Sequence, residues 1–297
     1  MKFLKGIIAP VVTPMKEDES INEAELRNQV NRLIDAGIHG IFTTGTNGEG
    51  YILSEEEKEQ VLSVVLDEVK GRVTVYAGTG CISTKETIRL SKRAEELGAD
   101  VLSIITPSFA KASQEELYEH YLAVASEVKL PIILYNIPDR TGNVLQPETV
   151  VRLAKVDNII GIKDSSGNFN NMLQYIDKTK DMDFSVYSGN DALILWTLLA
   201  GGAGAISGCA NVFPENMVNI YENYISGDME KAKKCQSNIN SFRECFGHGN
   251  PNTIVKTAVA LLGYPVGSCR RPFHKLPDTG VAAIKKVLED NKVLGIR

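Results

Sequence analysis

The sequence predicts a (β/α)8 barrel followed by a purely helical segment. Short apolar runs bounded by turn residues recur along the chain, as is typical of parallel strands that are buried on both faces. Amphipathic runs with helical spacing separate them, and eight such β/α units over roughly 210 residues are the number that closes a barrel. The last ~70 residues show helical patterns only. We therefore expect a barrel with the active site in residues 1–226 and a C-terminal helical extension packed on it in residues 227–297.

The predicted elements alternate regularly. The strands are expected at residues 7–12, 40–44, 73–77, 101–105, 131–135, 159–163, 184–188 and 204–207. The helices between them are expected at residues 24–36, 55–70, 84–97, 115–128, 147–155, 168–179 and 191–199. Further helices are expected at residues 215–225, 229–246, 251–262 and 280–291.

Helix starts are marked by local chemistry. Ser54, Ser83 and Ser113 each precede a glutamate by three residues, which predicts three capping boxes. Pro147 and Pro214 suit the first turn of a helix, where a missing N–H costs nothing. The alternative fold is an open doubly wound sheet with a dinucleotide site, but the glycine pair Gly78 and Gly80 lacks the third glycine of that motif.

Composition and residue spacing argue against several classes of protein. The net charge of −5 disfavours a general nucleic-acid partner, and Gly, Asn or charged residues interrupt the apolar stretches short of a membrane span. The N-terminus runs directly into the first strand, so we expect no signal peptide. Five scattered cysteines without a CxxC pair suit free thiols in the cytoplasm. The four histidines have no metal-ligand spacing, so no bound metal is expected.

Lys163 is the most informative residue of the chain. It ends the apolar strand 159–163, and an ammonium buried there costs several kcal/mol to desolvate. Loss of the proton avoids that cost and yields an amine that forms Schiff bases with carbonyl compounds. The alternative is a side chain that reaches solvent or pairs with Asp164.

Other polar residues follow neighbouring strands, at the barrel end where catalytic groups collect. The glycine-rich residues 45–50, which include Thr46, can offer backbone N–H groups to a carboxylate, or can be a simple turn. Tyr135 can move protons beside Lys163, or can be a packed core residue. Arg140 can hold a carboxylate through two hydrogen bonds, or can form a surface ion pair. Together these groups suit an imine between a lysine and a 2-oxo acid.

The chain resembles the dihydrodipicolinate synthase / N-acetylneuraminate lyase family of Schiff-base aldolases over nearly its whole length. The similarity is carried by residues 45–49 (Gly-Thr-Asn-Gly-Glu), 135–142 (Tyr-Asn-Ile-Pro-Asp-Arg-Thr-Gly) and 161–164 (Gly-Ile-Lys-Asp). The resemblance implies a pyruvate imine without metal or organic cofactor, an aldehyde as second substrate, and a homotetramer or homodimer. It implies catalytic roles for Lys163, Tyr135 and Thr46, and substrate-binding positions at Gly45, Asn47, Gly48, Arg140, Gly189 and Ile206.

Two departures from the synthase pattern affect the expected substrate. The synthase branch has a second threonine where this chain has Asn47, and a tyrosine donated across the dimer interface where it has Phe109. Since Phe cannot pass a proton, we first expect an aldolase for 2-keto-3-deoxy sugar acids or 4-hydroxy-2-oxoglutarate. The alternative is 4-hydroxy-tetrahydrodipicolinate synthase, which Arg140 favours. Related dehydratases or deaminases and a non-catalytic 2-oxo acid sensor are more distant alternatives.

Overall fold

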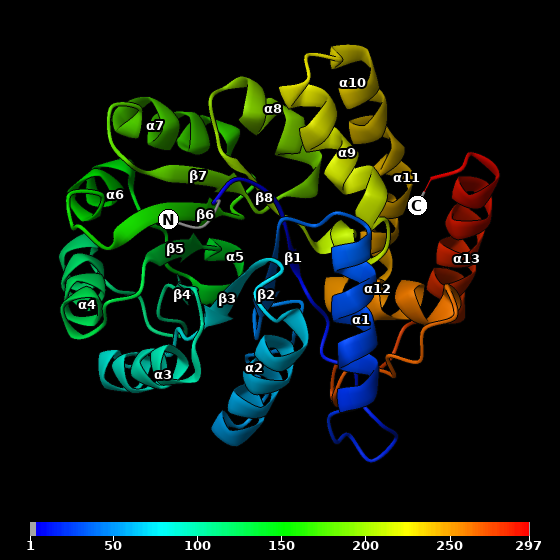
Figure 1. Ribbon diagram of the computed structural model, residues 1–297, viewed down its shortest axis with the longest axis horizontal. Helices are drawn as coiled ribbons and strands as arrows, with labels where there is room; N and C mark the ends of the chain where they lie inside the picture. The colour runs from blue at the N-terminus through cyan, green and yellow to red at the C-terminus, as the bar shows by residue number, and fades with distance from the viewer. Residues whose placement is uncertain (1–3, 297) are drawn as a thin grey trace.

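A computed structural model describes residues 4–296, and its strands close into a parallel barrel. The strands follow sequence order, and β1 pairs with both β2 and β8 (Figure 1). They are β1 (Gly6–Pro10), β2 (Gly40–Thr43), β3 (Thr74–Gly78), β4 (Val101–Ile105), β5 (Ile132–Asn136), β6 (Ile159–Asp164), β7 (Ser185–Ser188) and β8 (Gly204–Ile206). The (β/α)8 barrel predicted from the sequence is confirmed.

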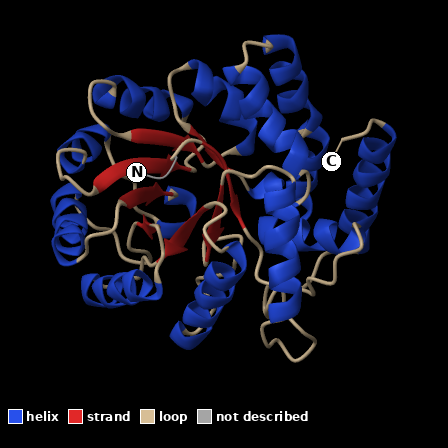
Figure 2. Cartoon of the chain, in the orientation of Figure 1, coloured by secondary structure: helices blue, strands red, loops and turns tan. Residues whose placement is uncertain are grey.

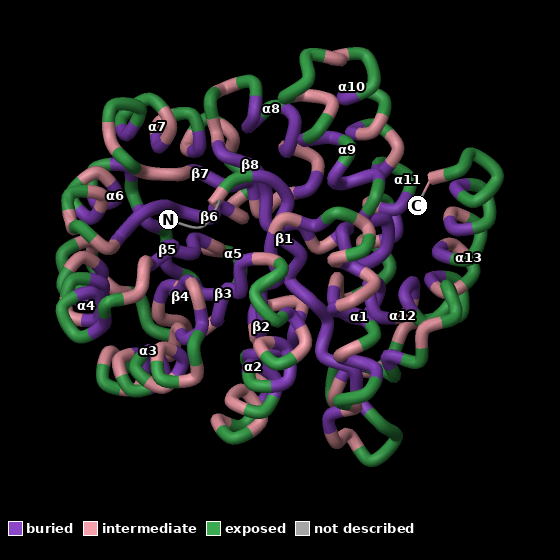
Figure 3. The backbone as a smooth tube through the Cα atoms, in the orientation of Figure 1, coloured by how far each residue is buried: buried purple, intermediate pink, exposed green. Residues whose placement is uncertain are grey.

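The helices surround the strands (Figure 2). They are α1 (Glu23–Asp35), α2 (Glu55–Val69), α3 (Thr84–Leu97), α4 (Gln114–Glu127), α6 (Pro147–Leu153), α7 (Phe169–Thr179), α8 (Ile194–Leu199) and α9 (Pro214–Ile225). The strands are buried along most of their length, whereas the helices bury one face only (Figure 3). Large side chains such as Phe42, Tyr76, Ile133 and Tyr187 fill the barrel interior, so the barrel is a packed core.

The C-terminal helices form a layer at one side of the barrel (Figure 1). They are α10 (Met229–Asn238), α11 (Asn240–Glu244), α12 (Pro251–Leu261) and α13 (Asp278–Val293). In this layer α10 packs against α9, and α13 packs against α12. The single helix predicted at 229–246 was wrong, because the chain breaks at Ile239 and continues as α11 and the 3-10 turn η3 (Cys245–His248). Two asparagines, which are weak helix formers, flank Ile239, and the break brings both Ile239 and Phe242 into the core.

The predicted capping boxes form at two of three helix starts. Ser54 and Ser113 make both reciprocal hydrogen bonds with the glutamate three residues later. At Ser83 only the hydroxyl half forms, because the Glu86 carboxylate instead binds Arg89 at 2.9 Å. Within residues 4–296, none of the helices has both the length and the apolar character that crossing a membrane requires.

Candidate active site

Lys163 lies inside the barrel with only 5% of its surface exposed. Its Nζ lies 4.0 Å from the centre of the Tyr135 ring and 5.5 Å from that of Phe42, so two aromatic faces stabilise the ammonium. Burial excludes the alternative in which Lys163 reaches solvent. Pairing with Asp164 is not seen either; that carboxylate accepts hydrogen bonds from Asn136 at 2.7 Å and from the Ser166 hydroxyl at 2.8 Å.

Gly189 creates the space that Lys163 occupies. A Cβ at this position would lie 1.9 Å from Ser165 Oγ and 2.9 Å from Lys163 Cε. Any larger residue therefore forces the lysine chain to move. This close approach at the end of β7 explains why a glycine follows the strand there.

The Tyr135 hydroxyl joins Lys163 to the loop after β2. Tyr135 Oη lies 3.1 Å from Thr46 Oγ1, so the two hydroxyls share a hydrogen bond. Burial alone would raise the pKa of Tyr135, but the charge of Lys163 and hydrogen bonds with Thr46, Lys163 and Ser165 together lower it below its usual value. Ser165 was not among the predicted site residues, although its place after β6 could have indicated it.

A cavity of about 660 Å³ opens at this end of the barrel. Four predicted site residues line it, namely Gly45, Thr46, Tyr135 and Arg140. Lys163 is not among the lining residues, but its Nζ lies beside the rings of Phe42 and Tyr135, which both line the cavity. The remaining predicted residues, Asn47, Gly48, Gly189 and Ile206, lie outside the lining.

Asn47 lies against the turn that follows β8. A Cβ on Gly208 would come within 2.6 Å of Asn47 Nδ2, so the amide packs over that glycine. Ile206, two residues earlier, is 1% exposed and belongs to the barrel interior.

Arg140 lies in a short helix that follows β5. Pro138 starts this helix, α5 (Pro138–Thr141), and Gly142 ends it. The guanidinium is exposed at the cavity and forms no ion pair within the described residues 4–296, so the alternative of a surface ion pair is not seen. Its five N–H donors remain available for a carboxylate.

The C-terminal segment also contributes to this cavity. Asn250, Asn252 and Phe273 line it, and the Phe273 ring packs edge-on against Tyr51 at 5.6 Å. Sequence reasoning missed these residues, because nothing local marks a residue that approaches the barrel from 200 positions away.

Two further side chains at the cavity are unusual. Ser103 on β4 is 2% exposed, and its hydroxyl finds no hydrogen-bond partner in the described structure. Phe109 follows the lining residue Ser108, is 98% exposed and has a φ of 77°, a conformation in which bulky residues are rare. In residues 4–296 no cluster of His, Cys, Asp or Glu is arranged to hold a metal ion.

Comparisons with known proteins identify the family. Residues 3–291 match the dihydrodipicolinate synthetase family. The 4-hydroxy-tetrahydrodipicolinate synthase of Methanopyrus kandleri is 41% identical over 289 residues, which are 96% of each chain. That of Syntrophus aciditrophicus is 41% identical over 294 residues, which are 99% of this chain and 100% of the relative.

Solved structures agree. The chloride-inhibited dihydrodipicolinate synthase of Acinetobacter baumannii, complexed with pyruvate, matches with a TM-score of 0.94 at 36% identity, over 97% of this chain and 99% of that chain. An E. coli K12 prophage protein of the dihydrodipicolinic acid synthase family, also in complex with pyruvate, matches with a TM-score of 0.93 at 34% identity over the same shares. The chain therefore belongs to the dihydrodipicolinate synthetase family of Schiff-base lyases, which act through an imine between pyruvate and an active-site lysine and use no metal cofactor.

Proposed function

We propose that Lys163 forms the imine with pyruvate and that Tyr135 and Thr46 move the protons. The lowered pKa of Tyr135 suits it to take a proton from the Lys163 ammonium. The free amine attacks C2 of pyruvate, and the resulting carbinolamine loses its hydroxyl as water when Tyr135 returns a proton. The imine then draws electrons from C3, which loses a proton and becomes the carbon that attacks an aldehyde.

The same proposal assigns the binding residues. The backbone N–H groups of residues 45–48, with Asn47, hold the carboxylate of pyruvate. Gly189 leaves room for the imine beside Lys163, and Ile206 forms the apolar floor. We also propose a homodimer or homotetramer, although one solved relative at 32% identity is described as a monomeric variant.

The reaction we favour is that of a 4-hydroxy-tetrahydrodipicolinate synthase, which condenses pyruvate with aspartate semialdehyde. The observation that carries it is Arg140, which lines the same cavity as Thr46 and Tyr135 and has free donors for a carboxylate on the aldehyde. The names of the relatives at 41% identity favour this reaction over the aldolase that we first expected.

Cleavage of a 2-keto-3-deoxy sugar acid or 4-hydroxy-2-oxoglutarate is the second candidate. Asn47 and Phe109 favour it, since neither can take the place of a relay hydroxyl. Both candidate reactions proceed through the same pyruvate imine. They differ only in the aldehyde that is joined to, or released from, C3 of pyruvate.

One set of mass measurements tests both the imine on Lys163 and the identity of the second substrate. Borohydride reduction with pyruvate should leave a single adduct on Lys163, and Lys163→Ala should show none; labelling elsewhere would refute the mechanism. Mass analysis after adding aspartate semialdehyde should show the cyclic condensation product. Pyruvate release from 2-keto-3-deoxygluconate without that product would establish the aldolase instead, and pyruvate binding without turnover of either would indicate a sensor.

A further inference from the structure

Helix α12 holds the loop that carries Thr46. Asn252, in its first turn, is 3% exposed and donates from Nδ2 to the Thr46 carbonyl at 2.7 Å and to Tyr51 Oη at 3.2 Å. Its own N–H is fixed by the Asn250 side chain at 3.0 Å. The amide thus reaches the loop from a helix that is itself anchored.

One turn further along α12, Lys256 holds the other end of the same loop. Its Nζ donates to Glu49 Oε1 at 2.8 Å, to the Thr13 carbonyl at 2.9 Å and to the Ser268 carbonyl at 2.8 Å. Lys256 and Glu49 are 1% and 0% exposed in their side chains, so the pair is screened from water.

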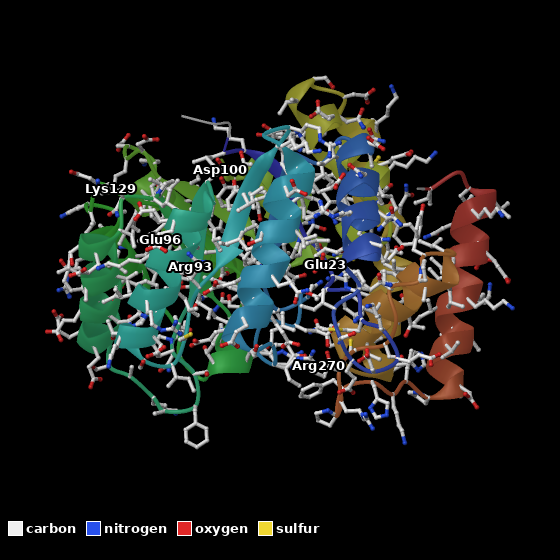
Figure 4. All side chains as sticks on the ribbon, turned by 60° about the horizontal axis from the view of Figure 1, so that its bottom comes forward. Glu23, Arg93, Glu96, Asp100, Lys129 and Arg270 are labelled. Atoms are coloured by element: carbon white, nitrogen blue, oxygen red, sulfur yellow. The ribbon has the colours of Figure 1, made fainter. Side chains whose placement is uncertain are left out.

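The second oxygen of Glu49 extends this attachment to the segment after α12. Glu49 Oε2 accepts from the Arg270 backbone N–H at 2.8 Å. The Arg270 side chain in turn binds Glu57 at the start of α2. Arg270 is labelled in Figure 4. The loop is therefore held at Thr46 and at Glu49 by residues more than 200 positions away in the sequence.

The backbone around these two points is constrained as well. Glu49 has a φ of 57°, and a Cβ on Gly50 would lie 1.8 Å from the Thr44 carbonyl oxygen. A loop with this shape has few ways to absorb a shift. The position of the Thr46 carbonyl therefore determines the direction of the Thr46 hydroxyl. That hydroxyl lies 3.1 Å from the Tyr135 hydroxyl.

We propose that Asn252 is a positioning residue, which sets the Thr46 hydroxyl against Tyr135 by holding the Thr46 carbonyl. Asn suits this role because its amide donates two hydrogen bonds and reaches both Thr46 and Tyr51. An aspartate would place an ionised acceptor against the carbonyl, and an alanine would leave the carbonyl without this donor. The effect of this positioning on turnover rests on the proposed function. The positioning of the Thr46 hydroxyl itself is independent of that function.

A double-mutant cycle separates positioning from a general structural effect. The rate of imine formation with pyruvate, measured by rapid quenching in borohydride, should fall about tenfold in Asn252→Ala and about 100-fold in Thr46→Ala. If Asn252 acts through Thr46, Asn252→Ala adds nothing once Thr46 is alanine. Losses that multiply in the double variant would overturn the proposal, and so would a normal rate in either single variant.

Asn158 provides a matched control. Its Nδ2 also donates to backbone carbonyls, those of Ala125 and Val128 at 3.0 Å each. Asn158 precedes β6, however, and so lies at the opposite end of the barrel from the C-terminal strand ends that carry the candidate site. Asn158→Ala should leave imine formation at the wild-type rate in both backgrounds.

A crystal structure of Asn252→Ala provides a readout that does not depend on any reaction. The Thr46 Oγ1 to Tyr135 Oη distance should exceed the hydrogen-bond limit of about 3.5 Å. A retained contact near 3.1 Å would refute the inference even if the enzyme proves to be a pyruvate lyase. If instead the contact is lost but the wild-type protein forms no imine, the positioning stands and the proposed function fails.

Discussion

Tyr135 and Lys163 are cross-strand partners on β5 and β6, and the lysine Nζ lies 4.0 Å from the centre of the tyrosine ring. The phenol is therefore fixed beside the amine by backbone pairing rather than by a mobile loop. A cation held against the ring also favours the phenolate, in keeping with the lowered pKa of Tyr135. The register of two strands thus places a phenol next to an amine, as the proposed proton transfer requires.

Tyr135→Phe should slow imine formation about 100-fold, because the ring remains to pack against Lys163 while the proton carrier is lost. Borohydride trapping over time measures the rate, and circular dichroism checks that the fold is retained. Tyr224→Phe serves as the control, since that hydroxyl donates to the Leu198 carbonyl on the outer layer. A wild-type rate in Tyr135→Phe would remove the phenol from the mechanism.

Arg140→Ala should lower kcat/KM for aspartate semialdehyde roughly 10- to 100-fold, the range of about 1.5–3 kcal/mol for a hydrogen bond to a charged group. The pyruvate imine should still form at the wild-type rate, because the pyruvate carboxylate binds at residues 45–48 in the proposed mechanism. Arg152→Ala, which removes a surface partner of Glu115 at 2.6 Å, is the matched control. Equal losses for both substrates would contradict a role confined to the aldehyde.

His120 should make the protein less stable as the pH falls. It is 5% exposed, and burial lowers its pKa from 6.5 to about 4. Between these values the unfolded chain binds a proton that the folded chain does not, so stability present above pH 6.5 is lost as the pH falls. The loss between pH 7 and pH 5 should be on the order of 2 kcal/mol.

Urea unfolding of wild type and His120→Gln at the two pH values measures this effect. The variant should lose less stability on acidification, whereas the same substitution at exposed His248 should change nothing. Parallel pH dependences in wild type and His120→Gln would show that His120 does not carry the effect.

The parts of this protein that could be predicted from sequence are those with a local cause. Helix 84–97 and strand 101–105 were placed to the residue, because a serine cap, a terminal glycine and an apolar run mark their limits. The burial of Lys163 could be anticipated because it is a charged residue at the end of a predicted buried strand. The locations of these elements follow from patterns that span a few residues.

Long-range partners leave no such pattern. Lys256 and Glu49 are 207 positions apart, and a lysine within a predicted helix is normally assigned to the surface. The role of α12 at the cavity was missed for the same reason. The wall of the cavity forms only in the folded barrel, where the ends of β2 and β5 lie beside the C-terminal segment.

Lys256→Met should destabilise the protein by about 3–5 kcal/mol, because it leaves the Glu49 carboxylate buried without its cation. Urea unfolding at pH 7 measures the loss. Adding Glu49→Leu should restore part of this stability, since the uncompensated charge is then gone, although the Thr13 and Ser268 carbonyls still lack their donor. A double variant less stable than Lys256→Met would mean that the Glu49 side chain stabilises the loop through its bond to the Arg270 N–H rather than through Lys256.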